Sequence, residues 1–372
     1  MTEPPLPVAI LTGFLGAGKT SLLNTLLKDP FLADAAVIIN EFGEVGIDHL
    51  LVERSDENVI EMASGCLCCT IRGDLIDTLD DLLNRRAAGA LKAFDRIVIE
   101  TTDLADPAPV LHAVMSEPTL LARLRLEGVI TVVDAVNGMA TLDAHAEAVK
   151  QVAVADRIVL TKVDLLVGRE GEDMLFAIIA RLRNLNPAAR LLTTHRNEAT
   201  AERLFTMGLF DASRKTPDVK AWLAAEAYAI GEKRQRHTAH AHHDHDHHHD
   251  VSRHDDHIRS FAFSDDRAIS PQGLELFLEL LKSYHGANLL RMKGIVKTSD
   301  QPGRPIVVHG VQHVFHPPVR LAAWPDADHR TRMVFIVKDI AKSEIEGLFK
   351  AFTDQIGEGA AAFTDKTLSL NR

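Results

Sequence analysis

Eight residues near the N-terminus constrain this chain more than any other segment. Residues 13–20 read Gly-Phe-Leu-Gly-Ala-Gly-Lys-Thr, which fits the Walker A pattern. An apolar run, Val8 to Leu11, precedes them and a helical run, Ser21 to Leu27, follows them. Glycines let backbone N–H groups close around phosphate oxygens, and the N-terminus of a helix favours an anion. The motif therefore predicts a nucleoside triphosphate site built on a strand, a loop and a helix.

Within this motif, Lys19 is expected to reach the β- and γ-phosphates, and the Thr20 hydroxyl is expected to bind Mg²⁺. The residues predicted to bind the nucleotide here are Gly13, Gly16, Ala17, Gly18, Lys19, Thr20 and Ser21. A second element is the run Arg96-Ile97-Val98-Ile99-Glu100, an apolar strand that ends in a carboxylate, as a Walker B strand does. Glu100 would hold Mg²⁺ directly or through water. The alternative is a strand-end acid that faces solvent.

The segment Thr161-Lys162-Val163-Asp164 follows another apolar run and indicates which base is bound. The Asp164 carboxylate can accept two hydrogen bonds from the N1–H and exocyclic NH₂ groups of guanine, a pair of donors that adenine lacks. The Lys162 stem is expected to pack along the purine. Thr161 stands where this motif usually has Asn. These residues predict GTP rather than ATP.

Short apolar runs alternate with helical runs over about the first 210 residues, which predicts an α/β fold with a mostly parallel sheet wrapped by helices. Strands are predicted at 8–12, 36–40, 58–62, 95–100, 128–134, 157–161 and 190–194. Helices are predicted at 20–28, 71–87, 107–116, 139–150, 170–184 and 199–207. The nucleotide should lie at the carboxyl ends of the strands.

A composition change divides the chain into a P-loop domain (1–215), a His/Asp-rich mobile linker (216–257) and a smaller α+β domain (258–372). In the last segment, strands are predicted at 258–263, 289–297, 305–311, 313–322 and 332–338, and helices at 271–284 and 342–353. Three histidines there, His309, His313 and His316, are interpreted as ordinary polar strand positions.

The bulk composition excludes several classes of protein. With 46% apolar and 25% charged residues, the chain of 372 residues is globular and long enough for two cores. Its net charge of −11 disfavours a nucleic-acid partner. No run of 18 apolar residues and no signal pattern occur in the sequence, so we expect a cytoplasmic protein without a membrane span.

The three cysteines of the chain, Cys66, Cys68 and Cys69, lie within four residues. Cysteines this close together are poorly placed to form a disulfide framework, and such a cluster instead indicates metal binding or redox chemistry. Thiolates are soft ligands suited to Zn²⁺ and Cu(I), and three of them leave a coordination position open for a donor or acceptor protein. We expect these residues to bind the metal from a loop. The alternative is a set of small buried side chains.

A second possible metal-binding segment lies in the linker. From His237 to His257, ten of 21 residues are histidine, interleaved mainly with aspartate. Imidazole binds Zn²⁺, Ni²⁺, Co²⁺ and Cu²⁺, so a mobile arm of this kind would raise the local concentration of such ions. The alternative is a solvated linker with no metal role in the cell.

The order of these motifs resembles that of the CobW-like P-loop GTPases, relatives of the nickel-delivery GTPases of hydrogenase and urease. The resemblance rests on Gly13–Thr20, Asn40–Asp48, Cys66–Cys69, Glu100–Thr102 with Ala105–Pro107, and Thr161–Asp164. It extends into the C-terminal segment and so covers nearly the whole chain. It implies a metallochaperone that couples GTP binding and hydrolysis to delivery of Zn²⁺ to an unidentified client metalloprotein.

The resemblance also implies roles for particular residues. The three cysteines would form the metal site, and Glu41 and Glu44 would lie in a nucleotide-responsive switch beside it. Glu41 is the candidate for orienting the attacking water, and His112 is either an accessory ligand or a surface residue. Asp103 stands where the family usually has Gly, and its carboxylate would repel the γ-phosphate, so we predict slow GTP turnover.

Two other functions stay open at this stage. One is a metal-buffering protein that uses GTP only as a structural ligand, which suits both the histidine tract and Asp103. The other is cobalt handling for cobalamin synthesis, although three thiolates are softer than Co²⁺ prefers. The sequence names neither the client nor the oligomeric state.

Overall fold

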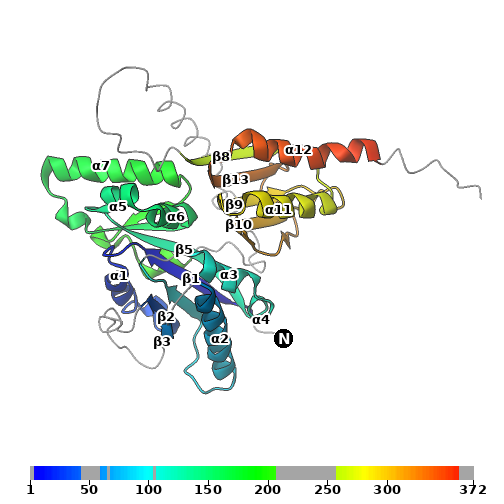
Figure 1. The fold of residues 1–372 in the computed structure, drawn as a ribbon. Helices are drawn as coiled ribbons and strands as arrows, with labels where there is room; N and C mark the ends of the chain where they lie inside the picture. The colour runs from blue at the N-terminus through cyan, green and yellow to red at the C-terminus, as the bar shows by residue number, and fades with distance from the viewer. Residues whose placement is uncertain (1–3, 43–58, 65–67, 104–105, 207–256, 360–372) are drawn as a thin grey trace, which may run out of the picture.

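The computed structural model describes residues 4–42, 59–64, 68–103, 106–206 and 257–359 (Figure 1). Two sheets organise these residues, one in the P-loop domain and one in the C-terminal domain. Residues 216–256 of the predicted linker and the predicted boundary between residues 215 and 216 lie outside the described residues, so the domain limits stay a prediction.

The first sheet has seven strands, all paired in parallel, in the order β3-β2-β4-β1-β5-β6-β7. The strands are β1 (Leu6–Gly13), β2 (Ala35–Phe42), β3 (Val59–Ser64), β4 (Arg96–Glu100), β5 (Leu124–Asp134), β6 (Arg157–Thr161) and β7 (Arg190–Thr193). All seven predicted strands are present. β5 begins four residues earlier than predicted because it pairs along the whole of β1, from Leu6 with Leu124 to Gly13 with Val132.

Alternate residues of the central strands face two separate cores. In β1, Val8 and Ile10 pack with α2 (Cys68–Ala87) and α3 (Ala108–Ser116) on one face. Ala9 and Leu11 pack on the other face, in a cluster that includes residues of α1 (Lys19–Leu26) and α8 (Ala201–Phe205). Both faces are therefore covered, which explains why the strands read as continuous apolar runs.

The remaining helices and turns of this domain correct one prediction. They are η1 (Pro30–Leu32), α4 (Pro118–Leu121), α5 (Gly138–Ala144), α6 (Ala146–Val154), η3 (Val163–Leu165), α7 (Gly168–Leu185) and η4 (His195–Asn197). The predicted single helix at 139–150 is wrong, because it is two helices. His145 between them has an extended backbone, and its ring stacks on Phe14 with a centroid distance of 4.4 Å. A contact with the P-loop therefore accompanies the break.

The C-terminal domain has an antiparallel sheet in the order β11-β10-β9-β13-β8, with β12 also paired to β10. Its elements are β8 (Ile258–Asp265), α11 (Pro271–His285), β9 (Leu289–Val296), β10 (Ile306–Val311), β11 (Val314–Phe315), β12 (Val319–Arg320), β13 (Thr331–Lys338) and α12 (Lys342–Gly359). The predicted strand at 313–322 is wrong, since β11 and β12 are separate. Pro317 and Pro318 lie between them, and proline cannot donate a ladder hydrogen bond.

Both faces of this second sheet are buried. One face packs against α11 and α12 through residues such as Phe335 and Phe349. On the other face, Leu290, Ile295 and Ile336 share a buried cluster with residues of α5, α6 and α7 of the P-loop domain. All eight residues of β9 are accordingly buried. The C-terminal domain is thus docked on the P-loop domain by a buried, core-like apolar contact.

A group of charged residues is buried within this contact. Asp156, just before β6, accepts hydrogen bonds from Arg291 and from Lys293 Nζ, the latter at 3.0 Å, and its other oxygen accepts the N–H of Val129 at 3.0 Å. Burial alone would raise the pKa of Asp156, but the charges of Arg291 and Lys293 hold it far below its ordinary value. Burial lowers the pKa of Lys293 to about 8, against the opposing attraction of Asp156.

His309 of β10 completes this group. It is 3% exposed, so the interpretation of His309 as an ordinary polar strand position is wrong. Burial, together with the charges of Arg291 and Lys293, lowers its pKa well below the usual range. The side chain is therefore neutral at pH 7. His316 is half-buried, and burial lowers its pKa as well.

Candidate functional site

The P-loop connects β1 to α1 through backbone conformations that glycine alone adopts easily. A Cβ at Gly13 would lie 2.4 Å from the carbonyl oxygen of Val132, which a real side chain cannot do. Gly18 has φ 90° and occupies the N-cap of α1 without any side-chain capping bond. The first N–H groups of α1 are consequently open to an anion. This is the geometry that a phosphate group requires.

Lys19 is buried at the base of the loop, 5% exposed, and its ammonium donates to the carbonyl oxygen of Gly13 at 2.9 Å. It also forms an ion pair with the Asp103 carboxylate. The sequence predicted that Asp103 would disturb the γ-phosphate position. In the structure, the Asp103 carboxylate pairs with the Lys19 ammonium, which is the group expected to bind the γ-phosphate.

The predicted Mg²⁺ residues are brought together from elements 80 residues apart. Thr20 Oγ1 donates to Glu100 Oε1 at 3.2 Å. Glu100 ends β4, next to β1 in the sheet, and is only 5% exposed. A hydroxyl and a carboxylate at this separation offer hard oxygen ligands of the kind Mg²⁺ takes.

A cavity of about 510 Å³ adjoins the P-loop on the side of the predicted guanine residues. It is lined by Gly18, Ser21, Leu22, Thr25, Leu26, Asp29, Thr161, Lys162, Asp164, Leu165, Thr194, Asn197, Ala199 and Thr200. Thr161 Oγ1 donates to the carbonyl oxygen of Ala17 at 2.6 Å, which ties β6 to the P-loop. The cavity therefore combines predicted phosphate residues and predicted base residues in one space.

Among the residues of this cavity that sequence reasoning missed are Thr194 and Asn197, which follow β7. Asn197 has φ 56°, a left-handed conformation that asparagine tolerates better than most residues. The available signal was their position after a strand at the carboxyl edge of the sheet, where ligands of α/β proteins bind.

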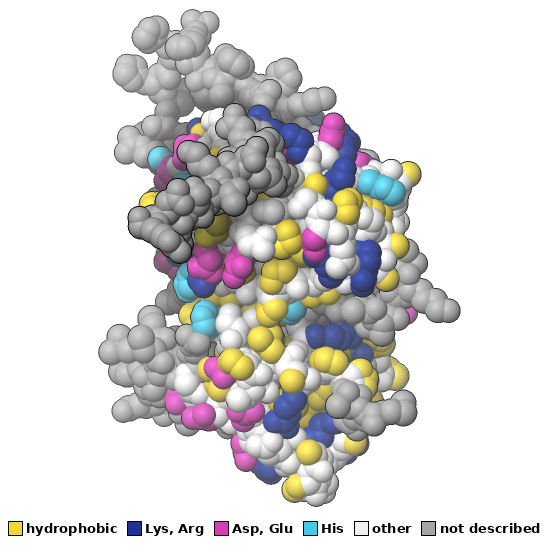
Figure 2. All heavy atoms as spheres, turned by 90° about the vertical axis from the view of Figure 1, so that its right-hand side faces the viewer, with side chains coloured by type: hydrophobic (Ala, Val, Ile, Leu, Met, Phe, Trp, Pro, Cys, Tyr) yellow, Lys and Arg dark blue, Asp and Glu magenta, His cyan; other side chains and the backbone are white. Residues whose placement is uncertain are grey.

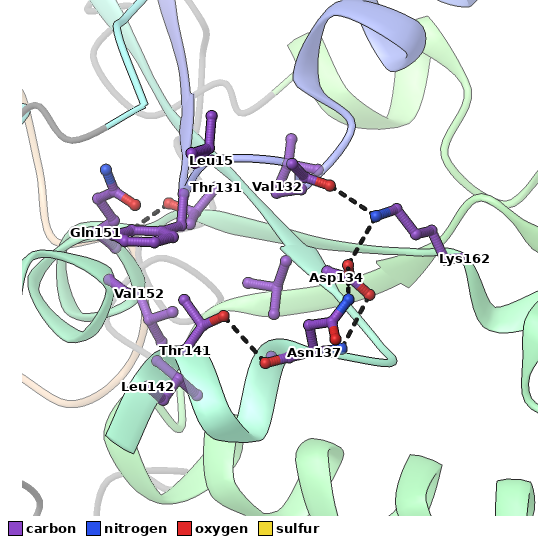
Figure 3. A pocket seen from close by; sticks show the side chains of 16 residues that line it. Leu15, Thr131, Val132, Asp134, Asn137, Thr141, Leu142, Gln151, Val152 and Lys162 are labelled. Carbon is purple, nitrogen blue, oxygen red and sulfur yellow. Dashed lines mark hydrogen bonds and ion pairs between the residues drawn. The ribbon is translucent and has the colours of Figure 1, made fainter. Parts of the chain in front are cut away.

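Lys162 bridges the P-loop and the end of β5. Its Nζ donates to the carbonyl oxygen of Gly16 and to Asp134 Oδ2, both at 2.7 Å (Figure 3). Burial alone would raise the pKa of Asp134, but hydrogen bonds from Lys162 and Asn137 keep it below its usual value. Sequence reasoning missed Asp134, although it ends an apolar strand as Glu100 does. A smaller cavity of about 200 Å³ lies beside this pair, under the P-loop residues Phe14–Ala17.

The predicted metal loop is only partly described. Cys66 and Glu44 lie outside the described residues, and for Cys68, Cys69 and Glu41 the backbone alone is described. Cys68 and Cys69 open α2, so the expectation that all three cysteines lie in a loop is wrong for these two. Glu41 is the next-to-last residue of β2.

The backbone places this segment on the nucleotide edge of the sheet. Ser64, the last residue of β3, pairs with Phe42 at the end of β2, and β2 lies beside β4, which ends at Glu100. α2 starts four residues after Ser64. From β3 to β1 are three strand spacings, roughly 14 Å. The start of α2 and the P-loop thus share the carboxyl edge of one sheet.

The predicted accessory histidines have mixed positions. His112 on α3 faces the C-terminal domain, with its ring 6.1 Å from that of His313, centroid to centroid. The histidine tract from His237 to residue 256 lies outside the described residues. Among the side chains that the structure describes, no group of three or more His, Cys, Asp or Glu is arranged to hold a metal ion.

Two global features bear on partners. None of the helices in the described part of the chain is long and apolar enough to cross a bilayer. On the face shown in Figure 2, acidic and basic side chains of described residues are interspersed with apolar ones.

Comparison with known proteins adds an independent finding. Residues 7–193 match the CobW/HypB/UreG nucleotide-binding domain, and residues 258–353 match the cobalamin synthesis protein cobW C-terminal domain. The chain is 32% identical over 345 residues to the zinc chaperone YjiA of Escherichia coli strain K12, covering 93% of this chain and 98% of that protein. It is 41% identical over 160 residues to the zinc chaperone CobW of Pseudomonas aeruginosa, covering 40% and 41% of the two chains.

Among solved structures, the Zn(II)-bound YjiA GTPase of E. coli is similar over 94% of this chain and 99% of its own, with a TM-score of 0.65 and 27% identity. The similarity therefore includes both domains.

Proposed function

Because the chain belongs to the CobW/HypB/UreG family of P-loop GTPases, we propose that it is a GTP-dependent metallochaperone for Zn²⁺. In this proposal Cys66, Cys68 and Cys69 bind the ion, and GTP binding and hydrolysis control its transfer to a client metalloprotein in the cytoplasm. Two relatives that the chain resembles are named zinc chaperones. The observation that carries the proposal is the shared edge of the sheet, on which α2 and the P-loop both begin.

The nucleotide residues proposed from the sequence fit the chemistry of Mg²⁺ and GTP. The open N–H groups of α1 and the positive φ of Gly16 and Gly18 suit a phosphate chain, while Thr20 and Glu100 offer oxygen ligands 3.2 Å apart. The proposed phosphate-binding set is Gly13, Gly16, Ala17, Gly18, Lys19, Thr20 and Ser21. When bound, Mg²⁺ neutralises charge on the phosphates. Lys19 binds and orients the phosphates, and hydrolysis depends mainly on positioning and electrostatics.

Guanine specificity is assigned to the exposed Asp164 carboxylate, with Lys162 and Thr161 shaping the cavity. Lys162 is already held by Gly16 and Asp134, so its stem forms one wall while Asp164 stays open to a ligand. We assign to Glu41 the orientation of the attacking water, since β2 ends beside β4 and Glu100.

Slow hydrolysis is the expected consequence of the Lys19–Asp103 ion pair. A carboxylate on the P-loop lysine opposes the γ-phosphate electrostatically and must move before the catalytic arrangement can form. Asp103→Gly should therefore raise the GTP hydrolysis rate, by about tenfold if the pair costs about 1.4 kcal/mol. Phosphate release under single-turnover conditions measures this. An unchanged rate in the variant would contradict the assignment.

A metal-buffering protein that uses GTP as a structural ligand is the second candidate, and the Lys19–Asp103 pair is the observation in its favour. The two candidates differ in one measurable respect. A chaperone hydrolyses GTP at a rate that depends on zinc or on a client, whereas a buffer shows no such dependence. Single-turnover hydrolysis with and without Zn²⁺ separates them.

The central experiment measures Zn²⁺ stoichiometry and affinity with GTP, with GDP and without nucleotide. The background should be a variant in which His242–His249 are replaced by serine and glycine, because imidazoles also bind zinc. We expect one ion per chain and an affinity that changes about fivefold or more between nucleotide states. Cys66→Ala should remove that ion. If the nucleotide leaves the affinity unchanged, the coupled-chaperone proposal fails.

A further inference from the structure

The turn between β10 and β11 places a strained residue of the C-terminal domain on the P-loop domain. Gln312 has φ 52°, a left-handed conformation that is uncommon for glutamine, and it is 7% exposed. Its Nε2 donates to Asp106 Oδ2 at 2.9 Å. Glycine would fit this backbone position without strain. A side chain kept at such a position, and buried on another domain, suggests that the contact itself has a role.

The turn is fixed rather than loosely apposed. Val311 and Val314, which flank it, belong to the same buried cluster as Leu111 and Val114 of α3. A turn anchored on both sides in the core of the other domain cannot shift without disturbing that packing. Gln312 therefore presents its amide to Asp106 from a rigid support.

Asp106 connects this contact to the nucleotide site. One of its oxygens accepts the N–H of Ala108 at 3.0 Å and so fixes the start of α3, while the other also receives Lys150 Nζ at 3.3 Å. The neighbouring residue on α6, Gln151, donates to the carbonyl oxygen of Asp103 at 3.3 Å. Lys150 thus contacts Asp106, and its neighbour Gln151 contacts Asp103. Asp103 in turn pairs with Lys19.

We propose that Gln312 is a positioning residue of the nucleotide site, which acts through Asp106 to keep the Asp103 carboxylate on Lys19. The inference rests on the proposed function of the P-loop as a GTP site. Because Asp103 competes with a γ-phosphate for Lys19, this contact lowers the affinity for GTP relative to GDP. By linkage, GTP weakens the hold of the β10–β11 turn on α3 to the same extent. The C-terminal domain is thereby a determinant of nucleotide preference.

Gln312→Gly is the informative variant. It removes the amide but relieves the left-handed strain, so loss of folding is not its expected effect. Calorimetric titration with GTP and with GDP, each with Mg²⁺, should show the ratio of the two dissociation constants moving about fivefold or more toward GTP. Asp339→Gly is the matched control. Asp339 is also left-handed and lies in the same domain, but its carboxylate contacts His257, which directly precedes β8, so the ratio should stay unchanged.

A double-mutant cycle tests the route through Asp106. Asp106→Ser keeps a residue able to cap α3 but removes the acceptor for Gln312. In that background Gln312→Gly should change the GTP/GDP ratio by less than about twofold, because residues coupled through a shared partner do not act additively. An unchanged ratio in the single variant, or an equal change in both backgrounds, overturns the inference. Failure of the unmodified protein to bind either nucleotide overturns the proposed function instead.

Discussion

β6 lies between Asp156, which precedes it and is buried against the C-terminal domain, and Lys162, which follows it at the open nucleotide edge. At the first end, the carboxylate of Asp156 is 5% exposed and its partners, Arg291 and Lys293, come from the other domain. At the second end, the side chain of Lys162 is 36% exposed and its partners come from its own domain.

The two ends differ in whether water or a ligand can take the place of the protein groups that contact the charged side chain. Water or a ligand can reach Lys162 and Asp164, so their charges remain available for binding. Asp156 depends on the docked C-terminal domain for the counter-charges of Arg291 and Lys293, and desolvation of a carboxylate is costly unless such counter-charges are present. One end of the strand is therefore a ligand site, and the other end specifies how two domains fit together.

The largest effect is expected from Asp156→Asn, which removes the buried carboxylate that Arg291 and Lys293 both contact. Breaking a buried pair of this kind costs about 3–5 kcal/mol in the free energy of unfolding. Denaturant titration measures it. Asp95→Asn is the control, because Asp95 precedes β4 as Asp156 precedes β6 but is 61% exposed. That variant should lose under about 0.5 kcal/mol. Equal losses of unfolding free energy in the two variants would contradict the special role given to the buried carboxylate of Asp156.

At the open end, Asp164→Asn should weaken GTP binding about 10- to 100-fold, since hydrogen bonds to a charged acceptor contribute about 1.5–3 kcal/mol. The free energy of unfolding should change by less than about 0.5 kcal/mol, because the residue is exposed. Competition binding with XTP sharpens the test. The amide that this substitution introduces can donate to the C2 carbonyl of xanthine, so the variant should favour XTP over GTP. Retained preference for GTP would remove Asp164 from the base site.

A smaller effect is expected from pH at the buried end. His309 is neutral in the fold, with its pKa held well below 6.5 by burial and by Arg291 and Lys293, while Asp156 opposes that shift. The unfolded chain therefore binds a proton that the fold does not, and stability falls as pH drops below 6.5. This contribution amounts to about 1 kcal/mol between about pH 7 and pH 5.5.

His309→Gln should remove that part of the pH dependence, whereas His316 and the other histidines remain in both proteins. Denaturant titrations of the two proteins at a series of pH values measure the difference. The difference between their free energies of unfolding should stay constant above about pH 7.5. Below about pH 6.5 the unmodified protein should lose stability faster than the variant. A gap that is constant over the whole range would show that His309 is charged or solvated in the fold.

Much of the P-loop domain could be predicted because its signals are local. Apolar runs such as Ile97–Ile99 and glycines such as Gly13 and Gly18 reflect strand burial and loop geometry within a few residues. Local signals did not predict the break between α5 and α6 at His145, whose ring stacks on Phe14. The strand predicted at 313–322 was also wrong, because Pro317 and Pro318 separate β11 from β12.

The sequence by itself predicted the nucleotide-binding chemistry, because Lys19 and Thr20 lie in a motif whose spacing is set by one strand, one loop and one helix, and Asp164 lies in a motif that directly follows one strand. The tertiary structure alone decided the partners of Asp103, Asp156 and Gln312. Each of these contacts joins residues between 84 and 206 positions apart. No local pattern encodes such a pair, since it depends on how two finished sheets and their helices pack against one another.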